Sequence, residues 1–481
     1  MTTKHPDTST ASPAVTLQDR SGSDAGTVDG KVGEAEQKSE DAALATEAST
    51  TGTATMSRKE KREAWTREIA CHIACLLVGW ADASTGPLVP FFQEHYSISY
   101  TVVSMLFVGQ AAGYFAAAPI AHFLNVRYGM GKVLVIGAVC QVIAYALLIP
   151  AFPFPVFPPL FAVAGLGSAV QDAQLNTYIA SLPHAERRLG FLHATYGFGA
   201  AICPLAATAF VNSGILFARF YAVSLGVGVL NVLCLLYAFK FSYVIKYSTP
   251  VAEAAQVETA LEHGAVPAEM VEAKKSWRES QLWQVIGNRT MIFTLIFICL
   301  YVGSEVAEGG WLTTYLLDVR DGGDISGYIA STYWSGILIG RIIFIPVTSL
   351  LGSQNAVIIY SLIALVLHFQ DSFAGNSAVF AIIGLFMGPS YPISVSVLTQ
   401  LLPSHHHATA IAFLAAMGQV GAALFPFFTG LLAGRFSPHI LPIVMIVLLG
   451  AQVLAWLGIP RLPSKKKQER RAEEEGNGEK V

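Results

Sequence analysis

Long apolar segments separated by short polar stretches recur along most of the chain. A helix needs roughly 20 residues to cross the hydrocarbon core of a bilayer. Twelve apolar segments are close to that length or longer, near residues 69–92, 101–123, 132–152, 157–181, 189–211, 216–239, 290–315, 327–351, 355–370, 375–402, 407–433 and 439–460. The pattern predicts an all-α membrane protein with twelve transmembrane helices, called spans 1 to 12 in chain order.

Three polar stretches interrupt the apolar pattern. Residues 1–64 are rich in Ser, Thr, Ala, Glu and Gly and contain no apolar run, which is typical of a disordered cytoplasmic tail. Residues 241–288 form a polar central loop, and residues 462–481 form a charged C-terminal tail. These stretches delimit two halves of six predicted helices each, an N-half at 65–240 and a C-half at 289–461.

Composition supports an integral membrane protein. Hydrophobic residues make up 53% of the 481 positions and charged residues only 13%, whereas about a quarter of an ordinary soluble domain is charged. The net charge of −3 does not indicate nucleic-acid binding, and the six cysteines fall in apolar stretches without the spacing of a metal or redox site. The sequence contains no phosphate-binding loop, catalytic triad or metal motif, so we expect neither an enzyme nor a cofactor.

Lysine and arginine collect in alternate loops. Examples are SRKEKREAWTR before span 1, Arg127 and Lys132 between spans 2 and 3, and Arg187 and Arg188 between spans 4 and 5. Because positive loops stay on the cytoplasmic side, both termini are predicted to be cytoplasmic. We expect a monomer in the plasma membrane, surrounded by lipid.

The two halves resemble each other in sequence. Several Gly, Ala and Pro positions recur in the same order about half a chain apart, which favours duplication over chance. The matching positions are Gly109, Gly113 and Pro119 against Gly336, Gly340 and Pro346, and GAAICP (199–204) against GAALFP (421–426). Two parallel repeats of six helices would place a substrate path between the halves, near the bilayer midplane.

The loop after span 2 carries a family signature. The stretch HFLNVRYGMGK (122–132) is similar to the motif Gly-x-x-x-Asp-Arg/Lys-x-Gly-Arg/Lys-Arg/Lys of the major facilitator superfamily. Arg127, Gly129 and Lys132 match the motif and by this resemblance would take part in gating, whereas its leading Gly and its Asp are absent. The chain resembles this superfamily over residues 65–462, and the missing residues disfavour its drug-exporter and usual sugar-porter branches.

Three further stretches resemble the fucose–proton symporter branch and its fungal and other eukaryotic relatives. They are GWADASTGPLVP (79–90), GLGSAVQDAQLN (165–176) and EVAEGGWLTTYL (305–316). The resemblance implies that Asp82 in span 1 and Asp172 in span 4 divide two tasks, contact with a sugar and exchange of a proton. The branch commonly has Glu where Asp172 stands, so which acid has which role is left open.

Asp82 lies in an otherwise apolar span. Counting 1.5 Å per residue from Ile69 places it about 20 Å into the membrane, where a charge costs from about 2.5 to more than 10 kcal/mol unless it is paired, hydrated or neutralised. We expect Asp82 to bind solute or to carry a coupling proton. The alternative is a structural carboxylate that is hydrogen-bonded to a neighbouring helix.

Span 4 carries a polar stripe. Ser168, Asp172 and Asn176 recur at four-residue intervals and therefore share one helix face, with Gln171 beside them. We expect Gln171, Asp172 and Asn176 to contact solute. A polar seam between two helices would explain the same stripe.

Span 7 combines acidic residues, glycines and an aromatic residue. Glu305 is the deeper of its two glutamates and a candidate for solute binding. Gly309 and Gly310 permit a kink or an unwound turn where an outer gate could flex, and Trp311 offers a stacking surface for a sugar ring. The alternative places Glu308 at the outer interface and Trp311 in the aromatic belt.

Further candidates lie in spans 5, 8 and 10. Arg341 could pair with a buried acid, bind an anionic group of the solute, or snorkel to the interface. His193 could relay protons, contact sugar or simply pack, and Tyr391 lies where Pro389 and Pro392 interrupt span 10 and expose backbone to the path. The three deep acids of spans 1, 4 and 7 outnumber the single base, and a buried acid without a partner favours its protonated form.

These features together predict a proton-coupled secondary transporter that moves a small polar solute, such as a hexose, by alternating access. Two alternatives are an antiporter that exports an amphipathic metabolite and a membrane nutrient sensor that does not transport. We expect protons and a small molecule as partners, and no nucleic acid.

Overall fold

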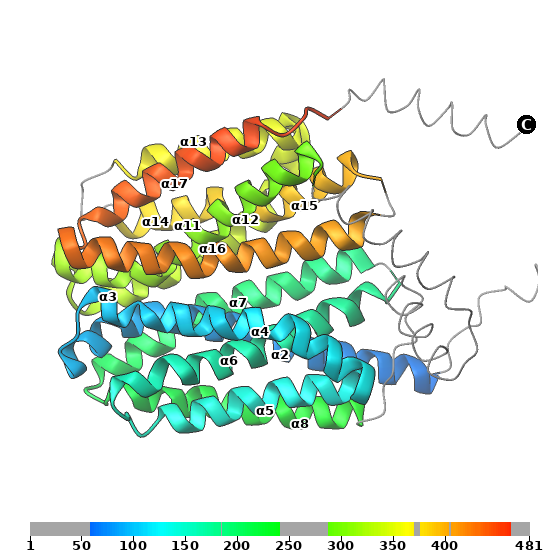
Figure 1. Cartoon of the computed structure of the whole chain (residues 1–481), viewed down its shortest axis with the longest axis horizontal. Coiled ribbons are helices and arrows are strands. Elements are labelled where there is room, and N and C mark those ends of the chain that lie inside the picture. The colour runs from blue at the N-terminus through cyan, green and yellow to red at the C-terminus, as the bar shows by residue number, and fades with distance from the viewer. Residues whose placement is uncertain (1–57, 184, 241–286, 370–375, 404–405, 463–481) are drawn as a thin grey trace, which may run out of the picture. The chain divides into compact units, whose positions relative to one another are not determined.

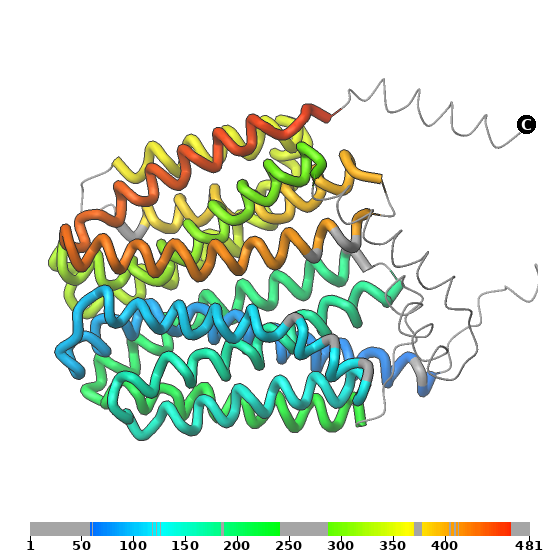
Figure 2. The backbone as a smooth tube through the Cα atoms, viewed as in Figure 1, coloured from blue at the N-terminus to red at the C-terminus, as the bar shows by residue number. Residues whose placement is uncertain are grey.

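The computed structural model of the chain describes residues 58–183, 185–240, 287–369, 376–403 and 406–462 (Figure 2). Most of the predicted N-terminal tail, central loop and C-terminal tail lies outside these ranges. Within them, eleven helical segments are long and apolar enough to cross a membrane, and the shorter apolar helix Ser353–Leu367 stands at the place of span 9. The predicted all-α fold with twelve membrane helices is confirmed.

Spans 1 to 6 form the N-half, drawn in blue to green in the lower part of Figure 1. Its helices are α2 (Arg58–Tyr96), α3 (Tyr100–Val103), α4 (Met105–Tyr128), α5 (Met130–Leu148), α6 (Phe157–Ala180), α7 (Ala185–Asn212) and α8 (Tyr221–Phe239). Helix α2 begins at Arg58, within the stretch assigned to the N-terminal tail.

Spans 7 to 12 form the C-half, drawn in green to red in the upper part of the same view. Its helices are α11 (Arg289–Arg320), α12 (Ser326–Leu351), α13 (Ser353–Leu367), α14 (Asn376–Met387), α15 (Ser390–Leu401), α16 (His407–Phe436) and α17 (Ile440–Leu457). Span 10 is divided between α14 and α15 at Gly388 and Pro389, as the prolines of this segment predict.

The repeated glycines pack equivalent helices in the two halves. A Cβ on Gly113 of α4 would lie 2.0 Å from the Ala162 carbonyl oxygen of α6, and a Cβ on Gly340 of α12 would lie 2.0 Å from the Leu385 carbonyl oxygen of α14. No side chain fits at such distances, so glycine lets span 2 touch span 4 and span 8 touch span 10.

The second repeated motif makes a matching pair of contacts. A Cβ on Gly199 of α7 would lie 2.1 Å from the Leu76 carbonyl oxygen, and a Cβ on Gly421 of α16 would lie 1.9 Å from the Cys299 carbonyl oxygen. Span 5 therefore packs on span 1 as span 11 packs on span 7. The duplication seen in the sequence is a duplication of helix contacts.

Contacts between the halves gather at the predicted extracellular end, where α2 and α11 end. Gly86 on α2 approaches α11 so closely that a Cβ would lie 2.2 Å from the Gly309 carbonyl oxygen. Nearer the same end, Tyr100 donates a hydrogen bond of 2.7 Å to Asp318. The halves are closed against each other here.

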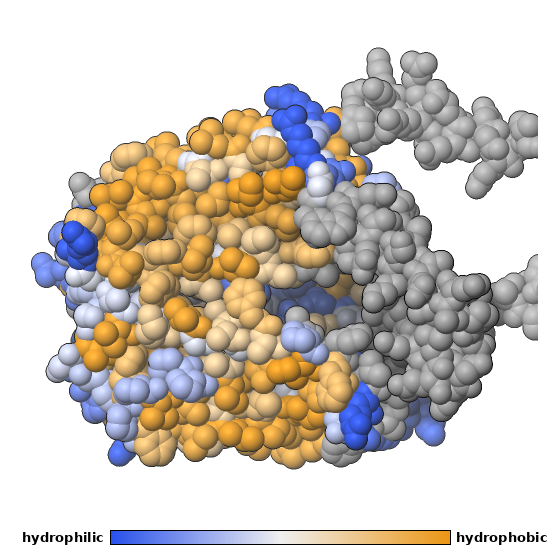
Figure 3. Space-filling view, in the orientation of Figure 1, coloured by the Kyte–Doolittle hydropathy of each residue, from blue (hydrophilic) through white to orange (hydrophobic). Residues whose placement is uncertain are grey.

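Towards the predicted cytoplasmic end the halves part. Gly197 on α7 faces α12, since a Cβ would lie 3.1 Å from Leu338 Cδ1. His193 lies one turn nearer the predicted cytoplasmic end on the same face of α7, and it is exposed. Figure 3 shows hydrophilic residues set back in a hollow between the halves, in the middle of the view.

Candidate functional site

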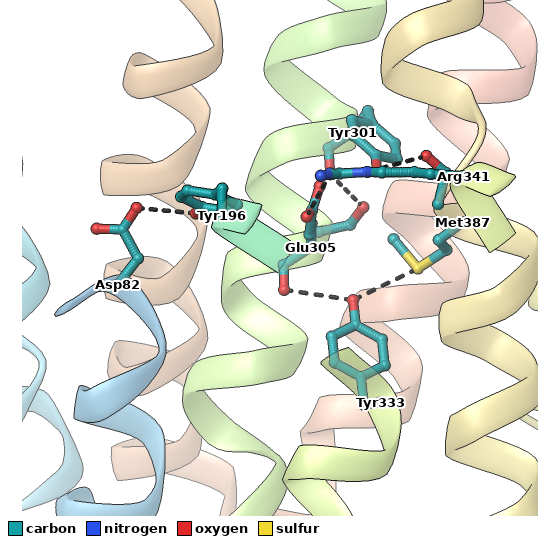
Figure 4. A network of polar contacts seen from close by, with 9 residues as sticks. Asp82, Tyr196, Tyr301, Glu305, Tyr333, Arg341 and Met387 are labelled. Atoms are coloured by element: carbon teal, nitrogen blue, oxygen red, sulfur yellow. Dashed lines mark hydrogen bonds and ion pairs between the residues drawn. The ribbon is translucent and has the colours of Figure 1, made fainter. Parts of the chain in front are cut away.

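Asp82 is held by three donors from two other helices. Gln110 Nε2 and the Tyr114 hydroxyl, both on α4, donate to Oδ1 at 2.7 and 3.1 Å. The Tyr196 hydroxyl on α7 donates to Oδ2 at 2.9 Å, and Figure 4 shows Tyr196 between Asp82 and the residues of the C-half. All three donors are neutral. In the part of the chain that the structure describes, Asp82 makes no ion pair.

Asp172 on α6 is partly exposed and has a local partner. Asn176 Nδ2, one turn further along the helix, donates to Asp172 Oδ1 at 3.0 Å and to the Asp172 carbonyl oxygen at 2.9 Å. Among the described residues Asp172, too, has no cationic partner. The N-half thus contributes two acids that are hydrogen-bonded but lack a counter-charge.

Gln171 lies on another face of α6 and is fully buried. Its amide donates to Gln141 Oε1 at 2.6 Å, and its own oxygen accepts from Asn231 Nδ2 at 2.8 Å. Gln141 in turn donates to Ser168 at 2.7 Å. Gln171 and Ser168 therefore belong to a polar seam between helices inside the N-half. This seam, the alternative explanation of the stripe, accounts for these two residues.

A small cavity lies beside this seam, with about 20 Å³ of room for the centres of water molecules. It is lined by polar groups of Ser84, Gln110, Tyr145, Ser168 and Tyr221, among apolar neighbours. The hydroxyls of Tyr145 and Tyr221 are buried and have no hydrogen-bond partner in the described chain. One water needs roughly 10–15 Å³, so the cavity suits a water molecule and is too small for a sugar.

Glu305 and Arg341 form an ion pair in the C-half. Arg341 Nη2 lies 3.3 Å from Glu305 Oε1, with side chains 19% and 8% exposed, respectively. Arg341 Nε also donates to the Gly388 carbonyl oxygen at 3.4 Å, at the break in span 10. Of the three roles weighed for Arg341, the geometry favours pairing with a buried acid. Figure 4 shows Tyr301 beside the guanidinium.

His193 and Tyr391 lie near this pair and belong to opposite halves. The Arg341 guanidinium is close enough to act electrostatically on both His193 of α7 and Tyr391 of α15. Asp172 also acts on Tyr391, and the ring of Tyr391 lies 6.5 Å from that of Tyr301. The described structure thus brings candidates from spans 1, 4, 5, 7, 8 and 10 to one interface.

Trp311, Gly309 and Gly310 lie in the closed seam between the halves. Trp311 is 2% exposed, so it does not belong to an aromatic belt, and its indole N–H donates to the Pro426 carbonyl oxygen at 2.9 Å. Helix α11 runs unbroken through both glycines. An unwound turn at these glycines is therefore wrong, whereas a kink stays a prediction. The missing side chains let α11 approach other helices, since a Cβ on Gly310 would lie 2.7 Å from Phe107 of α4.

The three predicted gating residues of the signature loop lie at the predicted cytoplasmic end. Gly129 joins α4 to α5 with φ of 78°, a conformation that favours glycine. Gly352 joins α12 to α13 in the same way with φ of 77°. Arg127 and Lys132 are exposed and form no ion pair with other described residues.

Sequence reasoning missed several residues of the site. Gln110, Tyr114 and Tyr196 bind Asp82, and the Tyr333 hydroxyl donates to the Glu305 carbonyl oxygen at 3.3 Å. Gln110 and Tyr114 lie four residues apart on α4 and so share one face, which was the available signal. Tyr196 stands next to Gly197, and no such spacing in the sequence pointed to it.

The sequence profile of the Major Facilitator Superfamily matches residues 71–369 and 356–479. The chain belongs to the major facilitator superfamily. It is thus a multi-pass membrane transporter and not an enzyme, as expected. The assignment to the fucose–proton symporter branch stays a prediction.

Three known proteins are similar to this transporter. Bypass of stop codon protein 6 of Saccharomyces cerevisiae is 26% identical over 413 residues, which cover 82% of each chain. The glucose/mannose transporter GlcP of Bacillus subtilis is 23% identical over 359 residues, 73% of this chain and 84% of that one. A crystal structure of a D-xylose-proton symporter shares the fold, with a TM-score of 0.65 and 13% identity over 84% of this chain and 98% of that one.

Proposed function

We propose that this protein is a proton-coupled symporter of a monosaccharide, with the solute bound between the halves at mid-membrane. The observation that carries the proposal is the difference in charge between the two halves. Glu305 has a counter-charge in Arg341, whereas Asp82 and Asp172 accept hydrogen bonds only from neutral groups among the described residues.

Two acids without a counter-charge suit proton coupling. Moving an ionised acid through a closed, low-dielectric state is costly, and binding a proton removes most of that cost. Asp82 can keep its place in either form because three donors surround it. In this proposal a proton on one acid and solute on the other allow the carrier to reorient.

The C-half and the interface supply groups that suit a sugar. Sites for small polar ligands combine hydrogen bonds from a few polar or charged side chains with contact to aromatic side chains. Asn176, His193, Arg341 and Tyr391 offer the first kind of contact, and the rings of Tyr301 and Tyr391 offer the second. The names of the relatives add support, because they include a glucose/mannose transporter and a D-xylose-proton symporter.

Alternating access follows from the two ends of the interface. In the described conformation the halves touch at the predicted extracellular end and part at the other, so solute and protons would exchange with the cytoplasm. Opening the outer seam requires the contacts of Gly86, Gly309 and Gly310 to separate. Gating by these glycines and by Arg127, Gly129 and Lys132 is part of the proposal.

The decisive experiment is transport by the purified full-length protein in liposomes. Uptake of labelled glucose, mannose, galactose and xylose is measured with and without an imposed pH gradient. We expect at least one of these sugars to accumulate only when the gradient is present and to exchange without it. Glu94→Gln, a change of an exposed acid at the end of α2, serves as the control and should transport as the wild type does.

Other outcomes would favour the alternatives. Proton-driven export of an amphipathic compound, with no sugar exchange, would support an antiporter. Sugar binding without any flux would support a sensor. Neither alternative accounts for the ring of hydroxyl, amide and charged groups around the interface as well as sugar transport does.

A further inference from the structure

A glutamate and a histidine meet inside the C-half, one turn along α11 from Glu305. Glu308 Oε2 lies 3.1 Å from His368 Nε2, and the two side chains are only 1% and 2% exposed, respectively. His368 follows the last residue of α13, which has 15 residues and is therefore only about 22 Å long. The helix is thus shorter than the roughly 30 Å hydrocarbon core, and the contact of His368 places its end beside Glu308.

Hydrogen bonding determines where the protons of this pair lie. His368 Nδ1 is 2.8 Å from the Ala364 carbonyl oxygen, which can only accept, so Nδ1 carries a hydrogen. A bond between Nε2 and Oε2 then needs one more proton. It is held either by an imidazolium that faces a carboxylate or by a carboxylic acid that faces a neutral imidazole. Without it, two lone pairs would face each other in a buried site.

The second oxygen of Glu308 makes loss of this proton unfavourable. Glu308 Oε1 is buried and has no hydrogen-bond partner in the described ranges. Deprotonation would leave a buried carboxylate without a donor on either oxygen, and an unmet charged group costs more than an unmet neutral one.

Few other ionisable groups face the pair. Helices α14 and α17 contain none, α13 contains only Tyr360, and α16 has only His407 and Arg435 at its ends. From α12, Tyr333 lies near Glu308, but its hydroxyl bonds to the Glu305 carbonyl oxygen. The nearest charges on α11 and α12 are those of the Glu305 and Arg341 pair.

We propose that Glu308 and His368 form a second proton-binding site, which holds one proton and thereby ties the end of α13 to α11. The site lies in the C-half and is distinct from Asp82 and Asp172. It goes beyond the proposed symport and does not depend on it, because the proton here holds two helices of one half together. The segment of α11 that it braces is the one that closes the seam with the N-half.

The proposal predicts how stability changes with pH. In an unfolded chain Glu titrates near pH 4.3 and His near pH 6.5, both approximate reference values. Above about pH 6.5 folding must therefore take up a proton at this site, so each further pH unit lowers the folded-to-unfolded ratio about tenfold until the folded pair itself releases the proton. Between about pH 4.3 and pH 6.5 the folded and the unfolded chain bind the same number of protons at Glu308 and His368. In that range the pair contributes its full share to the stability of the fold.

Glu308→Gln tests the proposal on the purified full-length protein in detergent, with no solute or gradient. A glutamine amide carries its own hydrogen and can donate it to Nε2, so the variant should fold and should not need the proton. We expect the melting temperature of the wild type to fall relative to that of Glu308→Gln as pH rises from about 6.5 to 9. Glu94→Gln, beside the exposed His95, is the matched control and should follow the wild type.

Each result decides the question. Parallel melting curves for the wild type and Glu308→Gln across this pH range would overturn the proposal. So would failure of Glu308→Gln to fold at any pH, because the amide supplies the hydrogen that the pair is proposed to need. A wild-type pH dependence that is lost in Glu308→Gln and kept in Glu94→Gln would support it, whatever the sugar assays show.

Discussion

Replacing Asp82 by asparagine removes a protonation equilibrium and keeps the shape of the side chain. In the wild type, Gln110 and Tyr114 donate to Oδ1 and Tyr196 donates to Oδ2. The asparagine carbonyl can accept the first two bonds. Its amide group must donate to Tyr196, whose hydroxyl then turns to accept. The variant therefore resembles a carrier in which Asp82 is always protonated.

The cost of this change depends on the charge of Asp82. A hydrogen bond to a charged group contributes about 1.5–3 kcal/mol and one between neutral groups about 0.5–1.5 kcal/mol. With three bonds to a carboxylate, Asp82→Asn would destabilise this conformation by about 3 kcal/mol, roughly a hundredfold in an equilibrium constant. If Asp82 is already protonated here, the loss is close to zero, so the melting temperature of the variant reports its charge state.

The transport assay separates coupling from binding. Wild type, Asp82→Asn and the Glu94→Gln control are reconstituted at equal density. Solute exchange is then measured at equal concentrations on both sides, and accumulation is measured under a pH gradient. If Asp82 carries the coupling proton, the variant should exchange solute at near wild-type rate and should fail to accumulate it.

Two results would contradict this assignment. Loss of exchange together with accumulation in Asp82→Asn would mean that Asp82 binds solute and that Asp172 is the better proton carrier. Accumulation at the wild-type level by both Asp82→Asn and Asp172→Asn would remove both acids from the coupling mechanism. Asp82 would then be a structural residue that its three donors hold in place.

Three further predictions follow from the same geometry. Asp172→Asn should weaken exchange as well as accumulation, in flux assays, because a charge-assisted bond to solute contributes about 1.5–3 kcal/mol. In thermal melts, Glu305→Gln and Arg341→Gln should each cost about 3–5 kcal/mol, and the double variant should cost less than their sum, since each single change leaves a buried charge alone. Gly86→Ala should open the outer seam and raise labelling of cysteines placed there, because its Cβ would lie 2.2 Å from α11 backbone; Gly226→Ala, with open space around it, should change nothing.

The spans and their duplication could be predicted because both depend on local sequence. An apolar run of bilayer length has few other folds open to it, and a glycine that recurs at helical spacing marks a close helix contact. Gly113 and Gly340 mark the repeat in the sequence itself. The same logic failed for Gly309 and Gly310, since glycine can break a helix or let it approach another, and the sequence of α11 does not say which.

The partners of the buried acids could not be predicted in the same way. Gln110, Tyr114 and Tyr196 reach Asp82 from helices 28 or more residues away in the chain, and uncharged side chains do not stand out in an apolar helix. His368 is a stronger example. Its meeting with Glu308 depends on α13 ending short of the membrane surface, and the apolar pattern extends to residue 369 without marking that end.

The duplication nevertheless explains how these partners are arranged. Tyr114 directly follows Gly113 on α4, and Arg341 directly follows Gly340 on α12. By its contacts Gly113 matches Gly336, since a Cβ on Gly113 would meet the Ala162 carbonyl oxygen and the Leu166 nitrogen, and one on Gly336 the Ala381 carbonyl oxygen and the Leu385 nitrogen. Tyr114 and Arg341 therefore lie on equivalent helices and on the same face, about one turn apart. Each one reaches an acid on the first helix of its own half.

These two side chains differ in one respect that bears on coupling. Arg341 carries a permanent charge, so Glu305 always has a counter-ion. Tyr114 offers Asp82 a neutral hydroxyl, so the charge of Asp82 has to be neutralised by a partner that binds and dissociates. A proton is the smallest such partner, and a tyrosine can donate to the carboxylate or accept from the carboxylic acid without moving. The same scaffold thus holds a permanent ion pair in the C-half and an acid that can exchange its proton in the N-half. This is why we place the coupling proton on the N-half side of the interface.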